Sequence, residues 1–256
     1  MIGVIDSGCG GVNVILECIK NFKQNFVYLV DNKNCPYGNK SVDELKQIVL
    51  NNIDYLIKNY DVDFIILGCN TASSILDYND YENIKCPIVK TIPDMKRICK
   101  PKDKSLLFAT KNTIMYSKYV KYYLMNYNNV LTLKIKNLPK VIDDCFSQKS
   151  TQNNEKITKI LENKLIFKKK LKNKYKNIKI IALGCTHFRH IEKEINMFFG
   201  NKIKFANCEN NVAYISKFFI KKQTKDARVK IVLTKKDNAL EQGLKNMFAG
   251  NLTILK

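Results

Sequence analysis

The sequence lacks the features that would place the protein in a membrane or send it across one. No apolar run among its 256 residues approaches the roughly 20 residues that a membrane-spanning helix needs. The segment Met1–Asp6 has no basic leader and predicts a strand instead of a signal peptide. We therefore expect a cytoplasmic protein. Its 45% of hydrophobic residues suffice for one large domain or two small ones, each with its own core.

The nine cysteines lack the spacing of a redox or metal motif. No pair has CxxC spacing, and none falls into a Cys/His zinc pattern. Because thiols stay reduced in the cytosol, we expect most of these residues to be small buried hydrophobes. We assign that role to Cys18, Cys86, Cys99, Cys145 and Cys208, and we expect no bound metal.

Arginine is scarce, although 44 basic residues face only 23 acidic ones and the formal charge is +21. Clustered cations favour nucleic-acid binding because they displace counterions from phosphates. Arginine, however, reads bases and phosphates better than lysine, and only Arg97, Arg189 and Arg228 are present. A chain rich in Lys and Asn is also what A/T-rich codons produce. We interpret the charge as solvated surface, and we keep binding of nucleic acid or an acidic partner as the alternative from another function class.

Short apolar runs alternate with amphipathic stretches, which is typical of an α/β protein with mainly parallel sheets. The clearest helix begins at Ser41-Val-Asp-Glu44, a capping box followed by apolar residues at helical spacing. The Lys-rich segment 153–177 predicts a surface helix that runs into a charged turn. We predict strands at residues 2–6, 26–31, 62–67, 87–91, 105–109, 130–134, 178–183, 204–206, 229–233 and 252–255.

A sequence pattern that occurs twice in the chain predicts two similar halves. The segments Asp63–Thr71 and Lys179–His187 each contain a buried-type strand, then Leu-Gly-Cys, then polar residues that open a helix. This repeat is explained by two related α/β half-domains that face each other. The active site would then lie in the cleft between them. We place residues 1–93 with 209–256 in the first domain and residues 94–208 in the second.

Three segments should meet where the strands end, because ligands of parallel sheets bind beyond the carboxyl ends of the strands. One is the Gly-rich turn Asp6–Gly11, which lacks the GxGxxG spacing of a dinucleotide site. The others are the turns at Cys69 and Cys185. A helix N-terminus lowers the pKa of a cysteine, whose ordinary value is about 8.5, so each is a candidate base. Two such bases on opposite faces of one carbon can invert a stereocentre.

Five segments in the same order resemble the glutamate racemase family over nearly the whole chain. They are Ile2-Gly-Val-Ile-Asp-Ser-Gly8 with Gly10-Gly11, Asp31 followed by Cys35-Pro-Tyr-Gly38, Cys69-Asn-Thr-Ala72, Thr110-Lys-Asn-Thr113 and Leu183-Gly-Cys-Thr-His187. The resemblance implies an isomerase that interconverts L- and D-glutamate without pyridoxal phosphate, metal or nucleotide. It also implies D-glutamate supply for peptidoglycan. A homodimer is compatible with the sequence.

The resemblance also implies residue roles. Cys69 takes the proton from the D-enantiomer and Cys185 takes it from the L-enantiomer, while Asp6 and His187 assist them. Residues that hold the substrate carboxylates and amine are Ser7, Pro36, Tyr37, Gly38, Asn70, Thr71 and Thr186, with Thr110 and Thr113 on a further substrate-side turn. Cys9 and Cys35 are expected to be neighbours of the site and not bases.

The sequence departs from the family pattern in places. Many members carry a glutamate in the second domain that contacts the substrate amine, and here Asp143 or Asp144 is the candidate. Cys9 stands where valine is usual, and Gly68 replaces a common alanine. The alternative is a related two-cysteine racemase for aspartate, a hydantoin or another acid. Aspartate-type relatives usually end the last motif in Thr-Glu, so His187 favours glutamate.

Overall fold

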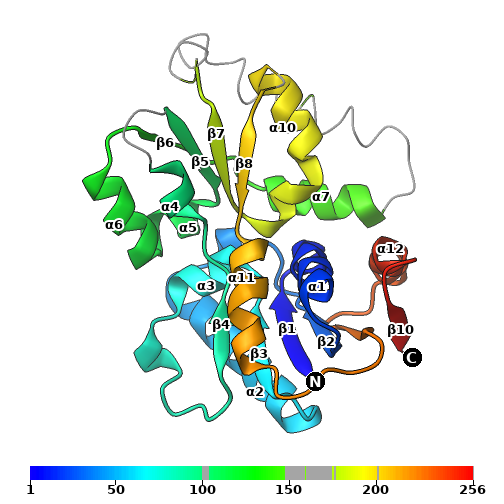
Figure 1. Ribbon diagram of the computed structural model, residues 1–256. Helices are drawn as coiled ribbons and strands as arrows, with labels where there is room; N and C mark the ends of the chain where they lie inside the picture. Colours follow the sequence, from blue (N-terminus) through cyan, green and yellow to red (C-terminus); the bar gives the residue numbers. More distant parts are fainter. Residues whose placement is uncertain (100–103, 148–158, 160–174, 176, 201, 256) are drawn as a thin grey trace.

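A computed structural model describes residues 1–99, 104–147, 159, 175, 177–200 and 202–255 of the chain. Two parallel sheets form its framework, one in the lower half and one in the upper half of Figure 1. The surface helix predicted within residues 153–177 lies outside the described residues, apart from single positions. Within the described ranges, no helix is long and apolar enough to cross a bilayer.

The first sheet has six strands in the order β10-β9-β2-β1-β3-β4, all parallel. Although they come last in the chain, the C-terminal strands belong to this sheet: β9 pairs with β2, and β10 pairs with β9. The strands are β1 (Ile2–Asp6), β2 (Asn25–Val30), β3 (Phe64–Leu67), β4 (Ile88–Lys90), β9 (Arg228–Leu233) and β10 (Thr253–Leu255). The helices of this half are α1 (Gly10–Asn21), α2 (Val42–Asn59), α3 (Asn70–Ile75), α11 (Glu209–Ser216) and α12 (Asn238–Phe248), with short turns η1 (Tyr37–Asn39), η2 (Tyr78–Asp80) and η4 (Lys217–Phe219).

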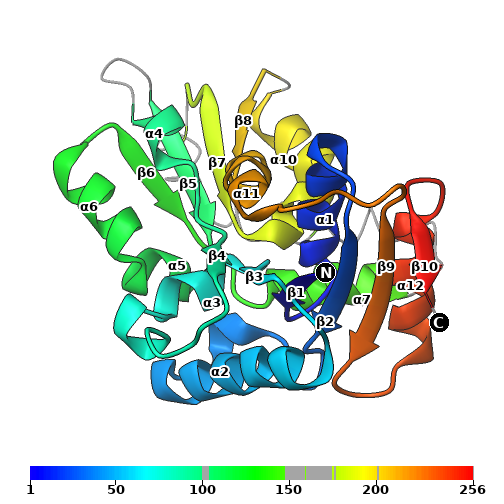
Figure 2. The same cartoon turned by 60° about the horizontal axis from the view of Figure 1, so that its bottom comes forward.

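The second sheet has four parallel strands in the order β6-β5-β7-β8. They are β5 (Ser105–Ala109), β6 (Val130–Leu133), β7 (Ile180–Gly184) and β8 (Lys204–Asn207). Its helices among the described residues are α4 (Met95–Ile98), α5 (Lys111–Tyr116), α6 (Lys118–Asn126), α7 (Leu138–Ser147), η3 (Thr186–Ile191) and α10 (Glu192–Phe199). Figure 2 shows α11 nearly end-on, close to α1. This helix follows β8 and packs against α1 and β4, so it carries the chain back to the first half.

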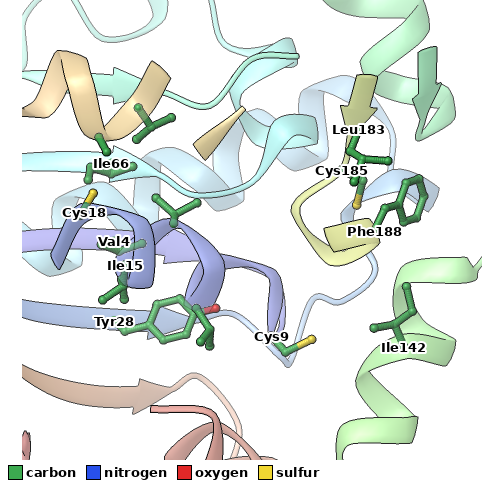
Figure 3. Packing of buried hydrophobic residues seen from close by; sticks show 14 of the residues in the cluster. Val4, Cys9, Ile15, Cys18, Tyr28, Ile66, Ile142, Leu183, Cys185 and Phe188 are labelled. Carbon is green, nitrogen blue, oxygen red and sulfur yellow. The ribbon is translucent and has the colours of Figure 1, made fainter. Parts of the chain in front are cut away.

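The hydrophobic core runs through both halves. One cluster of buried side chains contains Val4 and Ile15 of the first half together with Leu183 and Phe188 of the second, as Figure 3 shows. Helix α7 packs against α12, and α1 packs against η3. These contacts bring the two sheets together and thereby set the distance between the ends of their strands.

The α/β class and the parallel sheets are confirmed, and each predicted strand is present with ends that differ by at most two residues. The Ser41 half of the predicted capping box is confirmed as well, because its hydroxyl accepts a hydrogen bond from the Glu44 N–H at 3.3 Å. The domain boundaries at 93/94 and 208/209 stay a prediction. The strands of the first sheet come from residues 2–90 and 228–255, and those of the second from residues 105–207.

Candidate active site

The two cysteine turns lie at the carboxyl ends of strands in opposite sheets. Cys69 follows β3 and precedes α3, and Cys185 follows β7 and precedes η3. Both side chains are buried, with exposed fractions of 5% and 4%. The two thiols are close enough for Cys185 to influence the ionisation of Cys69. The repeated Leu-Gly-Cys pattern of the sequence therefore corresponds to two buried thiols that lie near each other.

The expectation that a helix N-terminus lowers the pKa of the base is wrong for Cys69. Burial is the largest cause and raises the pKa of this thiol well above its ordinary value, and the nearby charges of Asp6 and Cys185 raise it further. The hydrogen bond from the Ala72 N–H, which is the contribution of the helix start, acts in the opposite direction but is smaller. Desolvation outweighs a few backbone dipoles here.

Asp6 ends β1 and is fully buried beside the cysteine turns. Its carboxylate accepts hydrogen bonds from the Gly8 N–H at 3.1 Å and from the Thr186 hydroxyl at 3.0 Å, and the Ser7 hydroxyl lies at 3.5 Å. Burial raises the pKa of Asp6 to about 6, although the nearby His187 lowers it. Asp6 thus joins the first half to the second through Thr186, and its raised pKa of about 6 lies closer to neutral pH than that of an ordinary aspartate.

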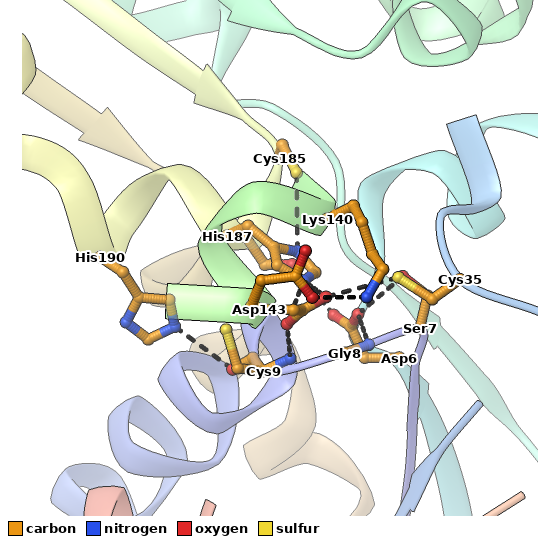
Figure 4. Close-up of polar contacts among 12 residues, drawn as sticks. Asp6, Ser7, Gly8, Cys9, Cys35, Lys140, Asp143, Cys185, His187 and His190 are labelled. Carbon is orange, nitrogen blue, oxygen red and sulfur yellow. Dashed lines mark hydrogen bonds and ion pairs between the residues drawn. The ribbon is translucent and has the colours of Figure 1, made fainter. Parts of the chain in front are cut away.

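His187 lies between Cys185 and Asp143, as Figure 4 shows. Its Nδ1 atom is 3.8 Å from the Cys185 sulfur, and its Nε2 atom is 3.1 and 3.2 Å from the two Asp143 oxygens. Burial alone would lower the pKa of His187, but Asp143 and Cys185 together raise it well above its ordinary value. Burial alone would likewise raise the pKa of Asp143, whereas His187 and the Cys9 hydrogen bonds hold it below its ordinary value. The pair is therefore a buried imidazolium and carboxylate.

The structure distinguishes the two aspartates that the sequence left open. Asp143 is buried in the site, whereas Asp144 is 41% exposed and forms an ion pair with Lys140 at 2.6 Å. Both lie on α7, the helix that packs against α12. Only Asp143 reaches the residues that the cysteine motifs bring together.

Asp143 also binds the loop that follows β1. Its carboxylate accepts hydrogen bonds from the Cys9 N–H at 2.7 Å and from the Cys35 thiol at 3.4 Å. The Cys9 thiol is a further hydrogen-bond partner of this carboxylate. The approach requires glycine at position 8, because a Cβ atom there would lie 2.2 Å from an Asp143 oxygen. Cys9 and Cys35 are thus neighbours of the site, where the sequence placed them.

Hydroxyl and amide groups connect the two halves beside Cys69. The Thr71 hydroxyl is 2.9 Å from that of Thr110, which in turn is 2.9 Å from that of Thr113. The Asn70 amide donates to the Thr91 carbonyl at 3.3 Å and accepts from the Cys208 thiol at 3.7 Å. Cys208, which the sequence treats as a structural residue, therefore supports a predicted site residue, and no motif signalled this.

The loop of Pro36, Tyr37 and Gly38 lies at the edge of the site. The peptide bond before Pro36 is cis, and the Tyr37 hydroxyl donates to Asp31 at 2.7 Å. Tyr37 is buried, so its hydroxyl is used to anchor the loop.

A cavity of about 690 Å³ opens beside this loop. It is lined by residues of both halves, including Pro36, Gly38 and Thr110. Four lysines also line it, namely Lys40, Lys111, Lys134 and Lys136. This charge suits a ligand that carries carboxylates.

Among the residues that the structure describes, one group of side chains could hold a metal ion. Cys9, Asp143 and His187 each offer a ligand atom, all within 4.8 Å of one another, and all three residues are buried.

Comparisons with known proteins agree on one family and one fold. The glutamate racemase of Clostridium kluyveri is 34% identical over 203 residues, which cover 76% of this chain and 74% of that protein. The glutamate racemase of Buchnera aphidicola is 32% identical over 228 residues, covering 87% and 86%. No protein-family model matches the chain.

Solved structures share the fold at lower identity. A glutamate racemase isoform from Bacillus anthracis superposes with a TM-score of 0.81 at 22% identity, covering 100% of this chain and 96% of that one. The Escherichia coli glutamate racemase, solved in complex with L-glutamate and the activator UDP-MurNAc-Ala, gives a TM-score of 0.77 at 18% identity, covering 99% and 96%.

Proposed function

Because the chain belongs to the glutamate racemase family, we propose that it interconverts L- and D-glutamate with Cys69 and Cys185 as the two proton-transfer groups. The observation that carries this proposal is the position of the two buried thiols, which follow strands of opposite sheets and lie close enough for Cys185 to raise the pKa of Cys69. A carbon held between them has one sulfur on each face.

The reaction needs only proton movements. One cysteine, as a thiolate, removes the proton from Cα and leaves a carbanion stabilised by the adjacent carboxylate. The other cysteine, as a thiol, delivers a proton to the opposite face. The configuration is inverted, and the two sulfurs have exchanged protonation states. Because no electrons leave the substrate, two thiols suffice for the chemistry.

The charges around the thiols suit an amino-acid substrate. Burial and Asp6 raise the pKa of Cys69, and the ammonium group of glutamate adds the positive charge that favours its thiolate. Asp6, which ionises near pH 6, is a partner for that ammonium group. The His187 imidazolium, held by Asp143, places a positive charge beside the Cys185 sulfur.

The two carboxylates of glutamate need donors at both ends of the molecule. We assign this role to Ser7, Asn70, Thr71, Thr110, Thr113 and Thr186, with the backbone N–H groups of Tyr37 and Gly38. Pro36, which has no N–H, sets the shape of that turn. The Thr71–Thr110–Thr113 hydroxyls already contact one another and can turn toward a carboxylate. The lysine-lined cavity next to Thr110 gives an anionic substrate a way in. The D-glutamate produced would serve peptidoglycan synthesis.

Circular dichroism of the purified enzyme, dialysed against chelator, tests the proposal. L-Glutamate should lose its optical signal much faster than L-aspartate or L-alanine, without added pyridoxal phosphate. Faster racemisation of aspartate would favour the related two-cysteine racemases. A requirement for pyridoxal phosphate would contradict the two-base mechanism.

A further inference from the structure

The Cys9–Asp143–His187 cluster brings together three metal-ligating atoms, an arrangement that racemisation does not use. Cys9 is fully buried and lies next to the proton-transfer residues without being one of them. It offers a sulfur, Asp143 an oxygen and His187 an imidazole nitrogen, all within 4.8 Å of one another. Sulfur, nitrogen and oxygen together are the donor types that zinc binds in proteins.

We propose that Cys9, Asp143 and His187 form an inhibitory binding site for a zinc-class divalent cation. The three residues come from the β1–α1 turn, from α7 and from η3, so they lie 134 and 44 positions apart along the chain. That separation is why the cysteine spacing in the sequence gave no metal motif.

The His187–Asp143 contact is close to the ligand spacing around a tetrahedral ion, and the Cys9 sulfur lies within 4.8 Å of both ligand atoms. Bonds of about 2.0–2.3 Å from zinc to nitrogen, oxygen and sulfur place neighbouring ligand atoms about 3.3–3.7 Å apart. The His187 Nε2 atom already lies 3.1 and 3.2 Å from the Asp143 oxygens, so an ion between them requires only a small expansion. The Cys35 thiol, 3.4 Å from an Asp143 oxygen, is a further sulfur beside the cluster.

The cluster can accept a cation because two of its groups carry protons that the ion can replace. The ion takes the place of the thiol proton of Cys9 and of the Nε2 proton of His187, and both protons pass to solvent. The Asp143 charge stays. The Nδ1 atom of His187 keeps its contact with Cys185, as the second ring nitrogen of a metal-bound histidine usually keeps a partner.

Inhibition follows from the residues that are shared, and this step rests on the proposed function. A bound ion occupies the imidazole nitrogen through which Asp143 holds His187. It also ties Cys9 of the first half to two residues of the second half, next to the cysteines.

Cobalt titration of the reduced, metal-free protein tests the site without any need for activity. Co²⁺ bound to a thiolate gives a near-ultraviolet charge-transfer band, which wild type should show with one ion per chain. Loss of an outer-shell partner already costs about 10–100-fold in affinity, so Cys9→Ala should weaken binding on the order of 100-fold or more. Cys18→Ala, on the same turn-and-helix segment but away from Asp143, is the matched control and should bind as wild type. Asp143→Asn should weaken binding too, which keeps the test decisive if Cys9→Ala fails to fold.

Zinc inhibition of racemisation is the second measurement. Zn²⁺ should inhibit wild type and Cys18→Ala, whereas Cys9→Ala should resist it by the same factor that separates the affinities. No thiolate band at a large excess of cobalt, or equal binding by wild type and Cys9→Ala, would overturn the site. A racemase without the band contradicts this proposal alone, and a protein with the band but no racemase activity contradicts the proposed function alone.

Discussion

Asp143 and His187 form a buried pair in which both carboxylate oxygens lie within 3.2 Å of the His187 Nε2 atom. The pair joins α7 to the turn that carries Cys185, because Nδ1 of the same ring faces the Cys185 sulfur at 3.8 Å. Asp143 thus reaches the Cys185 sulfur through the His187 ring. It acts on the chemistry through the protonation and orientation of His187.

Asp143→Asn tests this positioning role. The substitution keeps the size of the side chain but removes the charge that raises the pKa of His187, so the imidazole should lose its proton at a lower pH. We expect kcat to fall about 10–100-fold, equivalent to about 1.4–2.7 kcal/mol, and the alkaline limb of its pH profile to move to lower pH. Circular dichroism kinetics across pH measures both effects. The control Asp144→Asn changes the more exposed aspartate on the same helix and should alter neither kcat nor the pH profile. If Asp144→Asn lowered kcat as much as Asp143→Asn does, the effect would belong to α7 as a whole.

Gly8→Ala tests the close approach of the β1–α1 turn to Asp143. The added Cβ atom would lie 2.2 Å from a carboxylate oxygen, so the turn and α7 must separate. Overpacking of this kind typically costs about 1–3 kcal/mol, and activity should fall with it. Gly38→Ala is the steric control, because its Cβ atom would meet Thr110 at 3.5 Å, an ordinary contact. Urea denaturation of both variants should separate them, and equal stabilities would contradict the crowding at position 8.

Glu209→Gln tests a buried carboxyl group that the reaction does not use. Burial raises the pKa of Glu209 from 4.5 to about 7, Glu192 raises it further and Arg189 opposes the rise. Because the folded-state pKa is the higher one, this group stabilises the fold below pH 4.5, and the contribution is lost as pH rises through about 7. The complete loss is on the order of 3 kcal/mol.

Thermal unfolding at several pH values checks the Glu209 prediction. Glu209→Gln should be more stable than wild type at pH 8 and nearly equal to it at pH 4. The control Glu241→Gln breaks an exposed ion pair with Lys245 and should change stability by at most about 0.5 kcal/mol. A Glu209→Gln variant that gains nothing at pH 8 would show that the carboxyl group is ionised without cost.

The strands and the cysteine turns could be predicted from the sequence because they depend on local patterns. Apolar runs ended by polar turn residues located every strand within two residues, and the repeated Leu-Gly-Cys placed Cys69 and Cys185 at strand ends. Asp6 and the Cys185 turn each follow the carboxyl end of a strand, so two facing half-domains predicted that these segments would meet in one site, as the contact of Asp6 with Thr186 shows.

The remaining features depend on tertiary packing, which local patterns do not describe. Asp143 and Asp144 are neighbours on α7, and a rotation of about 100° between consecutive helical residues sends one into the site and the other to solvent. The sequence carries no sign of which one points inward. The direction of the Cys69 pKa shift was likewise missed, because the depth of burial outweighs the helix start that the sequence does reveal.

The last prediction separates the two cysteines. A serine hydroxyl is too weak an acid to form a base near neutral pH, although it keeps the approximate shape of the side chain. Cys69→Ser and Cys185→Ser should therefore each lose racemisation on the order of 10³-fold, equivalent to about 4 kcal/mol of barrier. Cys86→Ser changes a half-buried cysteine outside the site and should racemise as wild type does.

Each serine variant should still keep one thiolate on one face of the substrate carbon. A glutamate analogue with a leaving group on the β-carbon needs only one proton removed before the leaving group departs. With the roles that the family resemblance implies, Cys69→Ser should eliminate from the L-analogue and Cys185→Ser from the D-analogue. Both variants are assayed with both enantiomers. Near wild-type racemisation by either variant would show that its cysteine is not a base. Elimination from the same enantiomer by both would contradict the arrangement of the two thiols on opposite faces, even with the family assignment intact.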